Sequence, residues 1–522
     1  MSDPAQPPVD PAGGGGPAEP LVDVVVVGGG VAGLVAARDL AAGGMRVVVL
    51  EARDRLGGCV AGHEVAGLRL DCGAESFATR SPAVADLLTE LGLGNDIVTP
   101  TPGGAWVRLR DRTVPLPRAG VLGIPGRLWS QDVRQAIGVV GALRATADRV
   151  LPGRIGLAPQ AEQADLDAPA VRSSLGRLVR VRLGRRVHDR LVAPVVTGVH
   201  SARPDDVDLD LVLPGVRAAL MRHGSVPGAG SLATVVARTR AAAPAGSAVA
   251  GVVGGMHRLV TALADDLTGR GVVVRSGVTV EAVAPVDDTS WWVMTGGGEG
   301  RGVAARHLVL AVPGPVAAEL LRELVPEVDA LAAVSDAGAV LATLVVDAPA
   351  LDAAPRGTGV LVAEGAPGVT AKALTHGTAK WGWLAAQAGP GRHVLRLSYG
   401  RAGSPLPPGA GADLQATALA DASVLLGVPL EESQVVGYAR TVWDSGLPRP
   451  LPGQAERVAG VRSALRRLPG VHACGAWFAG TGLTAVVADA RATAAGVLAD
   501  AGGRDGHSTR PARSASDEPS AF

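Results

Sequence analysis

Runs of hydrophobic residues interrupted by glycine mark the first elements of the chain. Residues 22–27, VDVVVV, are typical of a buried β-strand, and this run stops at Gly28. The chain resumes as an Ala- and Leu-rich segment that ends at Gly43, and a second apolar run, residues 46–50, ends at Glu51. This order predicts a strand, a tight turn, a helix and a second strand.

The middle of the chain changes from helical to strand-like patterns. Residues 81–96 have the spacing of an amphipathic helix, residues 105–117 alternate like a β-hairpin, and residues 119–196 are mostly helical in pattern with Arg-rich faces. The segments VVVRSGVTVEAV and RHLVLAVP are predicted to return as strands to the first sheet, after the glycine turn and helix of GGMHRLVTAL. The segments VLATLVV, KWGWLAAQ and HVLRLSYG predict a second, mostly antiparallel sheet, and HACGAWFAGTGLTAVVADAR predicts a strand, a glycine-rich turn and a helix.

The first turn carries a nucleotide-binding pattern. Gly28, Gly30 and Gly33 have the spacing G-x-G-x-x-G, which permits a tight turn, lets backbone N–H groups approach a pyrophosphate, and lets the helix pack closely on the strand. Glu51 follows Gly33 by 18 residues, where a carboxylate can accept hydrogen bonds from an adenosine ribose. With strand, helix, second strand and acid in this order, the segment predicts a dinucleotide site.

Composition and charge exclude several functions. The formal net charge is +0, which gives no electrostatic case for binding nucleic acid or an anionic membrane. Hydrophobic residues make up 47% and aromatic residues only 2%, so the cores must be aliphatic. Cys59, Cys72 and Cys474 are too few for a disulfide framework and lack the spacing of a metal site, so no metal is expected and a reducing cytosol fits.

The ends of the chain predict tails rather than targeting or membrane segments. Residues 1–20 lack the basic and apolar regions of a signal peptide, and residues 502–522 are small and polar, so both are expected to be disordered. The uncharged run from Ala241 to Met256 is shorter than the roughly 18 residues that a spanning helix needs. We expect a cytoplasmic protein, and a peripheral contact with a membrane stays open.

Two further motifs resemble flavoproteins. The segment EARDRLGG, residues 51–58, is similar to the extended signature of flavin amine oxidases and glutathione-reductase-like flavoproteins, in which the Arg helps to bind the phosphates. The segment DCGAESF, residues 71–77, resembles the D-x-G-x-x-F turn that lies beside the flavin ring in these proteins. Cys59 departs from the pattern, because many relatives have a second basic residue there.

Nearly the whole chain apart from its tails resembles the protoporphyrinogen/coproporphyrinogen oxidases of haem biosynthesis, of the Gram-positive bacterial type. The segment AKALTHGTAKW, residues 371–381, is the most diagnostic, because amine oxidases and carotene desaturases do not share it. Other segments that carry the resemblance are LVAPVVTGVH, GGMHRLV, RLSYGR, ARTVWDSGLP and CGAWFAGTGLTAVVADAR.

This resemblance implies a bound FAD and a porphyrinogen substrate. The FAD is expected to be non-covalent, and the residues implied to contact it are Gly28, Gly29, Gly30, Ala32, Gly33, Glu51, Ala52, Arg53, Gly57, Gly58, Gly73, Ala74, Glu75, Ser76, Val278, Trp443, Gly475, Leu483, Thr484 and Ala485. The residues implied to lie near the substrate are Gly198, Ser398, Tyr399 and Arg401. Lys372 and Lys380 either bind a propionate or lie at solvent-facing strand ends. No catalytic side chain is assigned, and His188, His200 and His376 are interpreted as structural.

The implied reaction is oxidation of coproporphyrinogen III to coproporphyrin III, in which six hydrogens pass to the flavin and then to oxygen, with release of hydrogen peroxide. Protoporphyrinogen IX is the alternative substrate. Another flavin oxidoreductase activity, or a flavin-binding protein without oxidase activity, also stays open, because His200-Ser201-Ala202, Gly453-Gln454 and Asp489-Ala490-Arg491 depart from the family. Other haem-pathway enzymes are candidate partners.

The predicted fold class is α/β, with α+β character in the substrate part: a Rossmann-like FAD-binding domain, a mostly antiparallel-sheet substrate domain and a helical subdomain. The FAD-binding domain is expected to be discontinuous, with parts at 21–105, 251–315 and 441–501. The substrate domain is expected at 106–118, 197–250 and 316–440, and the helical subdomain at 119–196.

Overall fold

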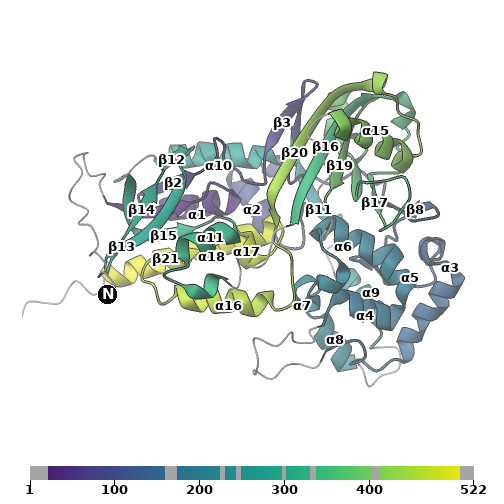
Figure 1. The fold of residues 1–522 in the computed structure, drawn as a ribbon, viewed down its shortest axis with the longest axis horizontal. Helices are drawn as coiled ribbons and strands as arrows, with labels where there is room; N and C mark the ends of the chain where they lie inside the picture. Colours follow the sequence, from purple (N-terminus) through teal and green to yellow (C-terminus); the bar gives the residue numbers. More distant parts are fainter. Residues whose placement is uncertain are drawn as a thin grey trace, which may run out of the picture.

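The structure is a computed structural model that describes residues 21–158, 173–223, 230–242, 248–296, 301–329, 337–401 and 412–505. Residues 1–20 and 506–522 of the two predicted tails lie outside the described residues, whereas 502–505 form the end of the last helix. Two lobes lie side by side, one built on the first sheet and the other on a second sheet with a group of helices below it (Figure 1).

The first sheet holds the predicted nucleotide turn. Its order is β12-β2-β1-β15-β14-β13, and β21 also pairs with β15. Strands β12, β2, β1, β15 and β21 are parallel, whereas β14 and β13 are antiparallel additions. The strands are β1 (Val22–Val27), β2 (Val47–Glu51), β12 (Val273–Ser276), β13 (Val280–Asp287), β14 (Ser290–Thr295), β15 (Gly302–Leu310) and β21 (Val471–Ala473). The sheet therefore collects strands from segments that lie far apart in the chain.

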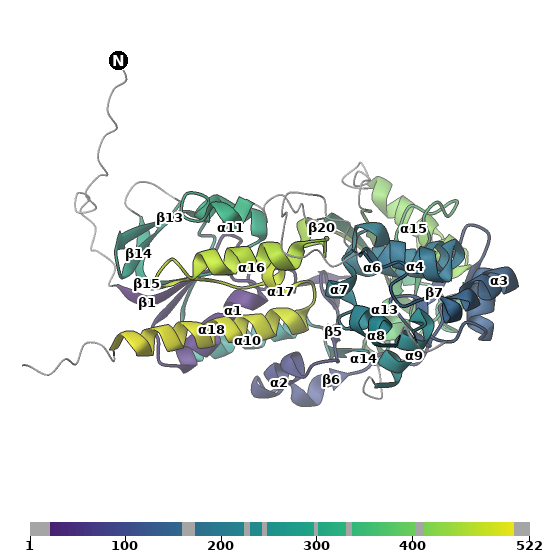
Figure 2. The same ribbon diagram turned by 90° about the horizontal axis from the view of Figure 1, so that it is seen from below.

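Helices cover both faces of this sheet, which explains why the valine side chains of β1 are buried on both faces. Val24 and Val26 belong to the core under α1 (Val31–Ala42), α10 (His257–Gly269) and α18 (Leu483–Asp505). Val25 and Val27 belong to the core on the opposite face, under α11 (Gly314–Leu321) and α16 (Gln454–Leu465). A strand buried on both faces reads as a continuous hydrophobic run. Figure 2 shows α18 and α16 running along the sheet.

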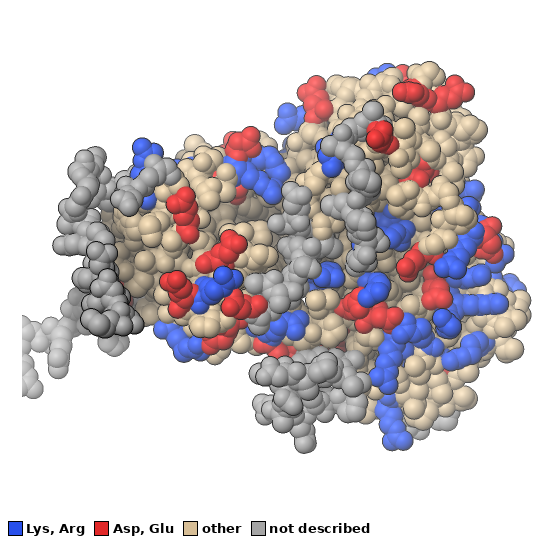
Figure 3. All heavy atoms as spheres, in the orientation of Figure 1, with Lys and Arg blue, Asp and Glu red and all other residues tan. Residues whose placement is uncertain are grey.

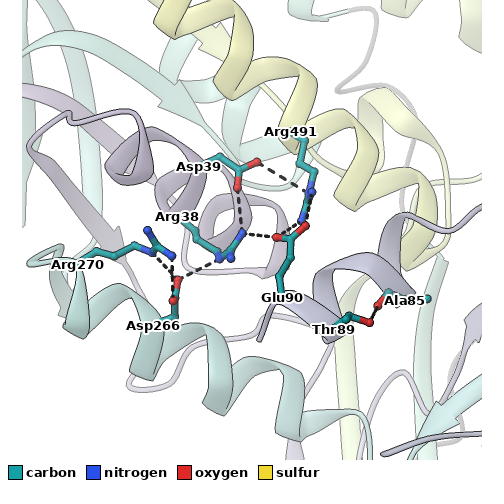
Figure 4. Close-up of polar contacts among 8 residues, drawn as sticks. All are labelled: Arg38, Asp39, Ala85, Thr89, Glu90, Asp266, Arg270 and Arg491. Atoms are coloured by element: carbon teal, nitrogen blue, oxygen red, sulfur yellow. Dashed lines mark hydrogen bonds and ion pairs between the residues drawn. The ribbon is translucent and has the colours of Figure 1, made fainter. Parts of the chain in front are cut away.

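An ion-pair network fastens the helices on one face (Figure 4). Arg38 of α1 is 9% exposed, and its guanidinium contacts Asp266 of α10 at 3.0 Å and Glu90 of α2 (Ala83–Glu90) at 2.7 Å. Arg491 of α18 binds the same Glu90 at 2.8 Å. Four helices that are distant in sequence are thereby held together by charge.

The second sheet has the order β20-β16-β19-β18-β17-β7-β8 and is antiparallel except for the parallel pair β17 and β7. Its strands are β7 (Trp106–Arg108), β8 (Thr113–Pro115), β16 (Ala337–Asp347), β17 (Gly359–Val362), β18 (Ala373–His376), β19 (Arg392–Tyr399) and β20 (Val435–Leu447). Alternate residues such as Ala342, Leu397 and Tyr399 pack in one core with α15 (Ala412–Leu426). The opposite face carries Leu341, Arg396 and Ser398, because neighbouring residues of a strand point to opposite faces.

The segment KWGWLAAQ was expected to form a strand of this sheet, and that prediction is wrong. The structure has two short helices there, α13 (Gly377–Lys380) and α14 (Gly382–Ala388). Trp381 and Leu384, three residues apart, are both buried. This helical spacing places them on one face, and Ala and Gln at the other positions favour a helix.

The helices below the second sheet share one hydrophobic core, which contains Leu178, Ile137 and Leu209. They are α3 (Gln131–Thr146), α4 (Leu175–Leu183), α5 (Arg185–Val187), the π-helical turn η3 (His188–Val192), α6 (Ala193–His200), α7 (Leu209–Val212), α8 (Val216–His223) and α9 (Leu232–Ala242). Helical structure thus continues from the range 119–196 into the range 197–250. The domain boundaries given above stay predictions.

Short strands connect the two lobes. A hairpin of β3 (Gly62–Val65) and β4 (Leu68–Asp71) precedes a three-stranded sheet with the order β5-β11-β6. Its strands are β5 (Phe77–Ala78), β6 (Ile97–Val98) and β11 (Val249–Val252), and a further small hairpin joins β9 (Gly120–Val121) to β10 (Ile124–Pro125). The segment between β4 and β5 is the D-x-G-x-x-F turn.

Candidate active site

The glycine turn after β1 has the geometry that the motif requires. Gly28 has φ +106°, and its N–H donates to the carbonyl of Leu50 at 2.7 Å. A Cβ on Gly33 would lie 1.9 Å from the carbonyl oxygen of Gly28, so only glycine lets α1 approach the strand this closely. A Cβ on Gly30 would meet no atom within 4 Å. The turn is therefore tight on the protein side and open where a ligand would lie.

The carboxylate of Glu51 accepts backbone hydrogen bonds from this turn and from the residues after β2. Its Oε2 accepts the N–H of Gly29 at 2.7 Å, and its Oε1 accepts the N–H of Arg53 at 2.8 Å, with Ala52 between them in the chain. The N–H of Val278 donates to the carbonyl of Glu51 at 2.9 Å. Val278, which is expected to contact FAD, therefore lies at the end of β2. Its backbone N–H is bonded to Glu51 and is not free to bind the cofactor.

The second glycine pair lies directly beside the first. The N–H of Gly57 donates to the carbonyl of Gly29 at 2.8 Å, and Gly57 and Gly30 form an isolated β-bridge. Gly57 and Gly58 have φ +96° and +57°, conformations that favour glycine. Two motifs that are separate in the sequence thus form one backbone surface.

Two arginines flank this surface and contact Trp443. The guanidinium carbons of Arg53 and Arg55 lie 6.0 and 5.5 Å from the centroid of the Trp443 ring, and the indole N–H donates to the carbonyl of Cys72 at 3.1 Å. Arg55 also donates to the carbonyl of Gly58 at 3.0 Å. Sequence reasoning assigned Arg53 and not Arg55. The signal available for Arg55 was its position two residues before Gly57 in the glycine motif. It lies close in the sequence to Cys59, where many relatives have a second basic residue.

The D-x-G-x-x-F turn packs against these motifs. A Cβ on Gly73 would lie 2.0 Å from the carbonyl oxygen of Cys59, and the N–H of Ala74 donates to that same oxygen at 3.0 Å. The carboxylate of Asp71 accepts the backbone N–H groups of Met256 at 2.8 Å and His257 at 3.0 Å. The turn is therefore fixed both to the glycine pair and to the start of α10, and Ser76 lies within it.

Glu75 of this turn binds two cations from the second lobe. Its Oε2 lies 2.7 Å from Nη2 of Arg396, and its Oε1 accepts from Nζ of Lys380. Burial opposes ionisation of Glu75, but the charges of Arg396 and Lys380 outweigh it and lower the pKa of Glu75 to about 2. Arg396 also donates to the carbonyl of Gly73 at 2.9 Å. Lys380 is therefore an ion-pair partner in this structure rather than a solvent-facing residue.

The C-terminal segment reaches the same region. Gly475, with φ +120°, donates its N–H to Oδ2 of Asp489 at 3.0 Å, and a Cβ on it would lie 3.7 Å from Cβ of Ala32. After the short helix α17 (Ala476–Ala479), α18 begins at Leu483, and Oγ1 of Thr484 donates to the carbonyl of Ala78 at 2.9 Å. Leu483, Thr484 and Ala485 thus lie beside the D-x-G-x-x-F turn, and Gly475 lies beside the nucleotide helix.

Three of the four expected substrate residues gather at one end of the second sheet. A Cβ on Gly198 of α6 would lie 2.7 Å from Cδ2 of Leu361 in β17. The carbonyl of Ser398 accepts the N–H of Lys372 at 2.8 Å, and Arg401 donates to the carbonyl of Ala371 at 3.3 Å. Tyr399 does not join this group.

Tyr399 is 1% exposed and belongs to the core under α15. Its hydroxyl donates to Oδ2 of Asp421 at 3.3 Å. It follows Ser398 directly in β19 and therefore points to the other face of the sheet.

The three histidines lie apart from one another. Nδ1 of His188 contacts Asp189, and Nε2 of His376 contacts Nδ1 of His393 at 3.0 Å in a buried pair. Burial lowers the pKa of His376 to about 4, and nearby His393 adds to the shift. Burial likewise lowers the pKa of His200 to about 4, helped by the charge of Arg80. In the part of the chain that the structure describes, no group of three His, Cys, Asp or Glu residues is placed to hold a metal ion.

Comparisons with known proteins decide the family. The profile of the family described as flavin containing amine oxidoreductase matches residues 31–498. The coproporphyrinogen III oxidase of Mycobacterium tuberculosis is 31% identical over 470 residues, which cover 88% of this chain and 94% of that protein. The chain belongs to the coproporphyrinogen III/protoporphyrinogen oxidase family. It is an oxidoreductase of the flavin amine oxidase superfamily.

A further relative and two solved structures are similar to this chain over most of their length. The coproporphyrinogen III oxidase of Propionibacterium freudenreichii is 29% identical, with 92% of each chain covered. A putative protoporphyrinogen oxidase from Exiguobacterium has a TM-score of 0.75 at 24% identity, covering 92% of this chain and 100% of that one. Putrescine oxidase has the same fold, with a TM-score of 0.63 at 18% identity and coverage of 93% and 99%. The α/β fold class is confirmed.

FAD is the cofactor of this oxidase family member. The described residues fit it: the space beside Gly30 is open, Glu51 places a carboxylate at the end of β2, and Arg53 supplies a positive charge beside the turn. The individual residues assigned above to FAD stay predictions.

Proposed function

We propose that the protein oxidises coproporphyrinogen III to coproporphyrin III, removing six hydrogens with oxygen as acceptor and releasing hydrogen peroxide. Bound FAD supplies the redox chemistry. The chain's own residues bind and orient the macrocycle beside the D-x-G-x-x-F turn, against the face of the second sheet that carries Ser398. Protoporphyrinogen IX is the alternative substrate, because both substrates share the tetrapyrrole ring and differ in their number of carboxylates.

The observation that carries this proposal is that two segments with the family resemblance contact the same carboxylate. Lys380 belongs to AKALTHGTAKW and Arg396 belongs to RLSYGR, and both bind Glu75 of the D-x-G-x-x-F turn. The most diagnostic segment of the sequence, together with a second segment that carries the resemblance, therefore attaches to the turn that is expected beside the flavin. Curated relatives named coproporphyrinogen III oxidase cover nearly the whole chain and support the same substrate.

An amine oxidase activity is less well supported, although putrescine oxidase shares the fold. By resemblance, amine oxidases enclose their substrate in an aromatic cage. The chain has only two tyrosines, and Tyr399 and Tyr438 both pack in the core under α15. Neither tyrosine can contribute to a cage on the face that carries Arg396 and Ser398.

The test is anaerobic mixing of the purified holoprotein with coproporphyrinogen III, protoporphyrinogen IX and putrescine in separate experiments. We expect coproporphyrinogen III to bleach the absorbance of the oxidised flavin. When oxygen is then admitted, this absorbance should return and hydrogen peroxide should be released. A larger kcat/KM for protoporphyrinogen IX would reverse the substrate preference. Bleaching only by the amine, or by none of the three compounds, would refute porphyrinogen oxidation.

The flavin is proposed to be held without a covalent bond. The C-terminal segment near the nucleotide helix contains Cys474, which is fully buried, and burial strongly raises the pKa of its thiol, so it does not form a reactive thiolate. Denaturation followed by filtration should release free FAD into the filtrate. Flavin that stays with the precipitated protein would contradict this proposal.

A peripheral contact with an anionic membrane is also proposed, through the exposed face of α3. Val139, Val140 and Leu143 are 62%, 68% and 64% exposed, and Val150 just beyond the helix is 80% exposed. Exposed arginines lie on the same and neighbouring helices: Arg144, Arg149, Arg185 and Arg186. Figure 3 shows basic residues gathered on this group of helices, a local excess that the zero net charge hides.

Apolar side chains beside arginines suit an anionic lipid surface. Over the described ranges, no helix is both long and apolar enough to cross a membrane. Sedimentation with anionic vesicles, compared with zwitterionic vesicles, tests the proposal. Replacement of Val139, Val140 and Leu143 by Gln should abolish co-sedimentation, and equal recovery with and without vesicles for the original protein would reject it.

A further inference from the structure

We propose that Lys372, Ser201 and Arg401 form a binding site for a carboxylate group, which, if the proposed function holds, is a propionate of the porphyrinogen. The three residues meet where the C-terminal end of α6 lies against the ends of β17, β18 and β19. The family resemblance implies that Arg401 lies near the substrate, and Ser201 belongs to the tripeptide His200-Ser201-Ala202, which departs from the family.

Lys372 provides a buried cation with one side-chain partner. It is 3% exposed and precedes β18, and its Nζ donates to Oγ of Ser201 at 2.6 Å. Among the described residues, no carboxylate pairs with it. A buried ammonium group is normally paired or loses its proton, because burial removes its hydration. Burial does lower the pKa of Lys372 to about 8, and the positive charge of Arg401 adds to the shift.

Arg401 adds a second cation to the site. Its guanidinium donates to the carbonyl of Val362 at 3.3 and 3.4 Å and to the carbonyl of Ala371 at 3.3 Å, next to Lys372 in the chain. Burial lowers the pKa of Arg401, and the exposed Glu364 opposes the shift. The segment that follows, residues 402–411, has the sequence AGSPLPPGAG and contains no acid. The immediate sequence therefore supplies no counter-charge for Lys372.

The hydroxyl group of Ser201 is placed to accept a hydrogen bond from Lys372 and to donate one to an anion. It ends α6 with φ +49°, a left-handed conformation that costs backbone free energy for a residue other than glycine. Its hydroxyl oxygen accepts from Lys372, which leaves its O–H free to donate to a carboxylate oxygen. The neighbouring His200 cannot supply a third charge, because burial lowers its pKa to about 4.

These features select a carboxylate. Two cations and one hydroxyl donor converge without an acid on Lys372, and a carboxylate offers two oxygens that accept several charge-assisted hydrogen bonds. Gly198, one turn before Ser201 on α6, lies against Leu361, because a Cβ on it would be 2.7 Å from Cδ2 of that leucine. The site therefore lies beside the other residues expected near the substrate, at the edge of the face that carries Ser398.

The experiment compares binding of coproporphyrin III with binding of its tetramethyl ester, measured by porphyrin fluorescence on the FAD-loaded protein. We expect the original protein to prefer the acid, and Lys372→Gln to lose about tenfold of that preference, the factor for one charge-assisted hydrogen bond. The affinity for the ester should not change. The control is Arg392→Gln, which removes an ion-paired cation at the other end of β19 and should keep the preference.

Two further variants keep the test decisive if Lys372→Gln does not hold FAD. Ser201→Ala and Arg401→Gln should each lower the acid-to-ester ratio severalfold. An unchanged ratio in the folded variants overturns the carboxylate site, even if the original protein oxidises coproporphyrinogen III. If the original protein binds neither porphyrin and oxidises no porphyrinogen, the proposed function fails as well, and the two failures are thus distinguishable.

Discussion

Arg396 of β19 and Glu75 of the D-x-G-x-x-F turn form an ion pair across the two lobes, with Nη2 and Oε2 2.7 Å apart. Lys380 binds the other oxygen of the same carboxylate. All three side chains are largely buried, between 16% and 18% exposed. The turn is thereby fixed to the second sheet by charges that have little access to water.

Replacing Glu75 by Gln should strongly destabilise the protein. The substitution leaves Lys380 and Arg396 buried beside each other without an anion, and the loss expected from a carboxylate whose pKa falls from 4.5 to about 2 is about 3 kcal/mol in the free energy of unfolding. Urea unfolding of the FAD-loaded protein at pH 7 measures it. Asp347→Asn, which breaks the more exposed pair with Arg392, is the control and should have a much smaller effect.

The stability that Glu75 contributes should depend on pH with a definite sign. Its pKa is lower in the folded state, so the unfolded chain binds the proton more readily and protonation favours unfolding. The contribution of Glu75 to the free energy of unfolding is complete above pH 4.5 and is lost as the pH falls from 4.5 toward 2. The difference in unfolding free energy between the original protein and Glu75→Gln should shrink over that window. A constant difference would contradict the assigned ion pairs.

Two glycines of the nucleotide turn should respond differently to alanine. Gly30 has φ −71° and open space at the position of a Cβ, so Gly30→Ala should fold normally and lose FAD affinity only. Gly33→Ala places a Cβ 1.9 Å from a backbone oxygen and should lower both stability and FAD content. Thermal unfolding and flavin absorbance separate the two effects. Gly269→Ala, where a Cβ meets no atom within 4 Å, should change neither.

Glu51 should contribute to FAD binding through its carboxylate. Glu51→Ala is expected to weaken FAD binding by about 1.5 to 3 kcal/mol, because a charge-assisted hydrogen bond to the ribose is lost. The carboxylate also accepts the N–H groups of Gly29 and Arg53, so Glu51→Gln, which keeps an acceptor oxygen, should lose less affinity. Titration of the apoprotein with FAD gives both values. Equal affinity in Glu51→Ala and the original protein would show that the acid does not serve the cofactor.

Glu90 should stabilise the helix layer of the first lobe without affecting catalysis. It holds Arg38 and Arg491 together, and hydrogen bonding from Arg491 lowers the pKa of Glu90 despite partial burial. Because Glu90 is 37% exposed, solvent and salt screen its interactions, and Glu90→Gln should lower Tm by only a few degrees. The decrease should be larger in low salt than in high salt. Glu327→Gln, which removes an exposed surface pair with Arg467, is the matched control.

Much of the first lobe could be predicted because its signals are local. The apolar run of β1, the glycine spacing and the acid at Glu51 each arise from a few consecutive residues, and the structure brings them together. Backbone conformation and close approach at Gly28 and Gly33 depend on the absence of a side chain, which the sequence displays directly.

The second lobe was harder to predict because its assignments depend on which face of the sheet a residue occupies. Ser398 and Tyr399 are consecutive in a motif that resembles relatives, yet they point to opposite faces of β19. The segment KWGWLAAQ has strand-like alternation of large side chains, but the burial of Trp381 and Leu384 follows a helical spacing. Neither distinction can be made before the neighbouring elements are in place.

The sequence by itself therefore determined the nucleotide turn, the fold class and the family, because these depend on backbone conformation and on local hydrophobic patterns. Only the tertiary structure decided that Lys380 and Arg396 share Glu75, and that Lys372 lies beside Ser201 and Arg401. The physical reason is that charges interact through space over a few ångströms. Glu75 and Lys380 are 305 residues apart in the chain, and only the contact between the lobes brings them within hydrogen-bonding distance.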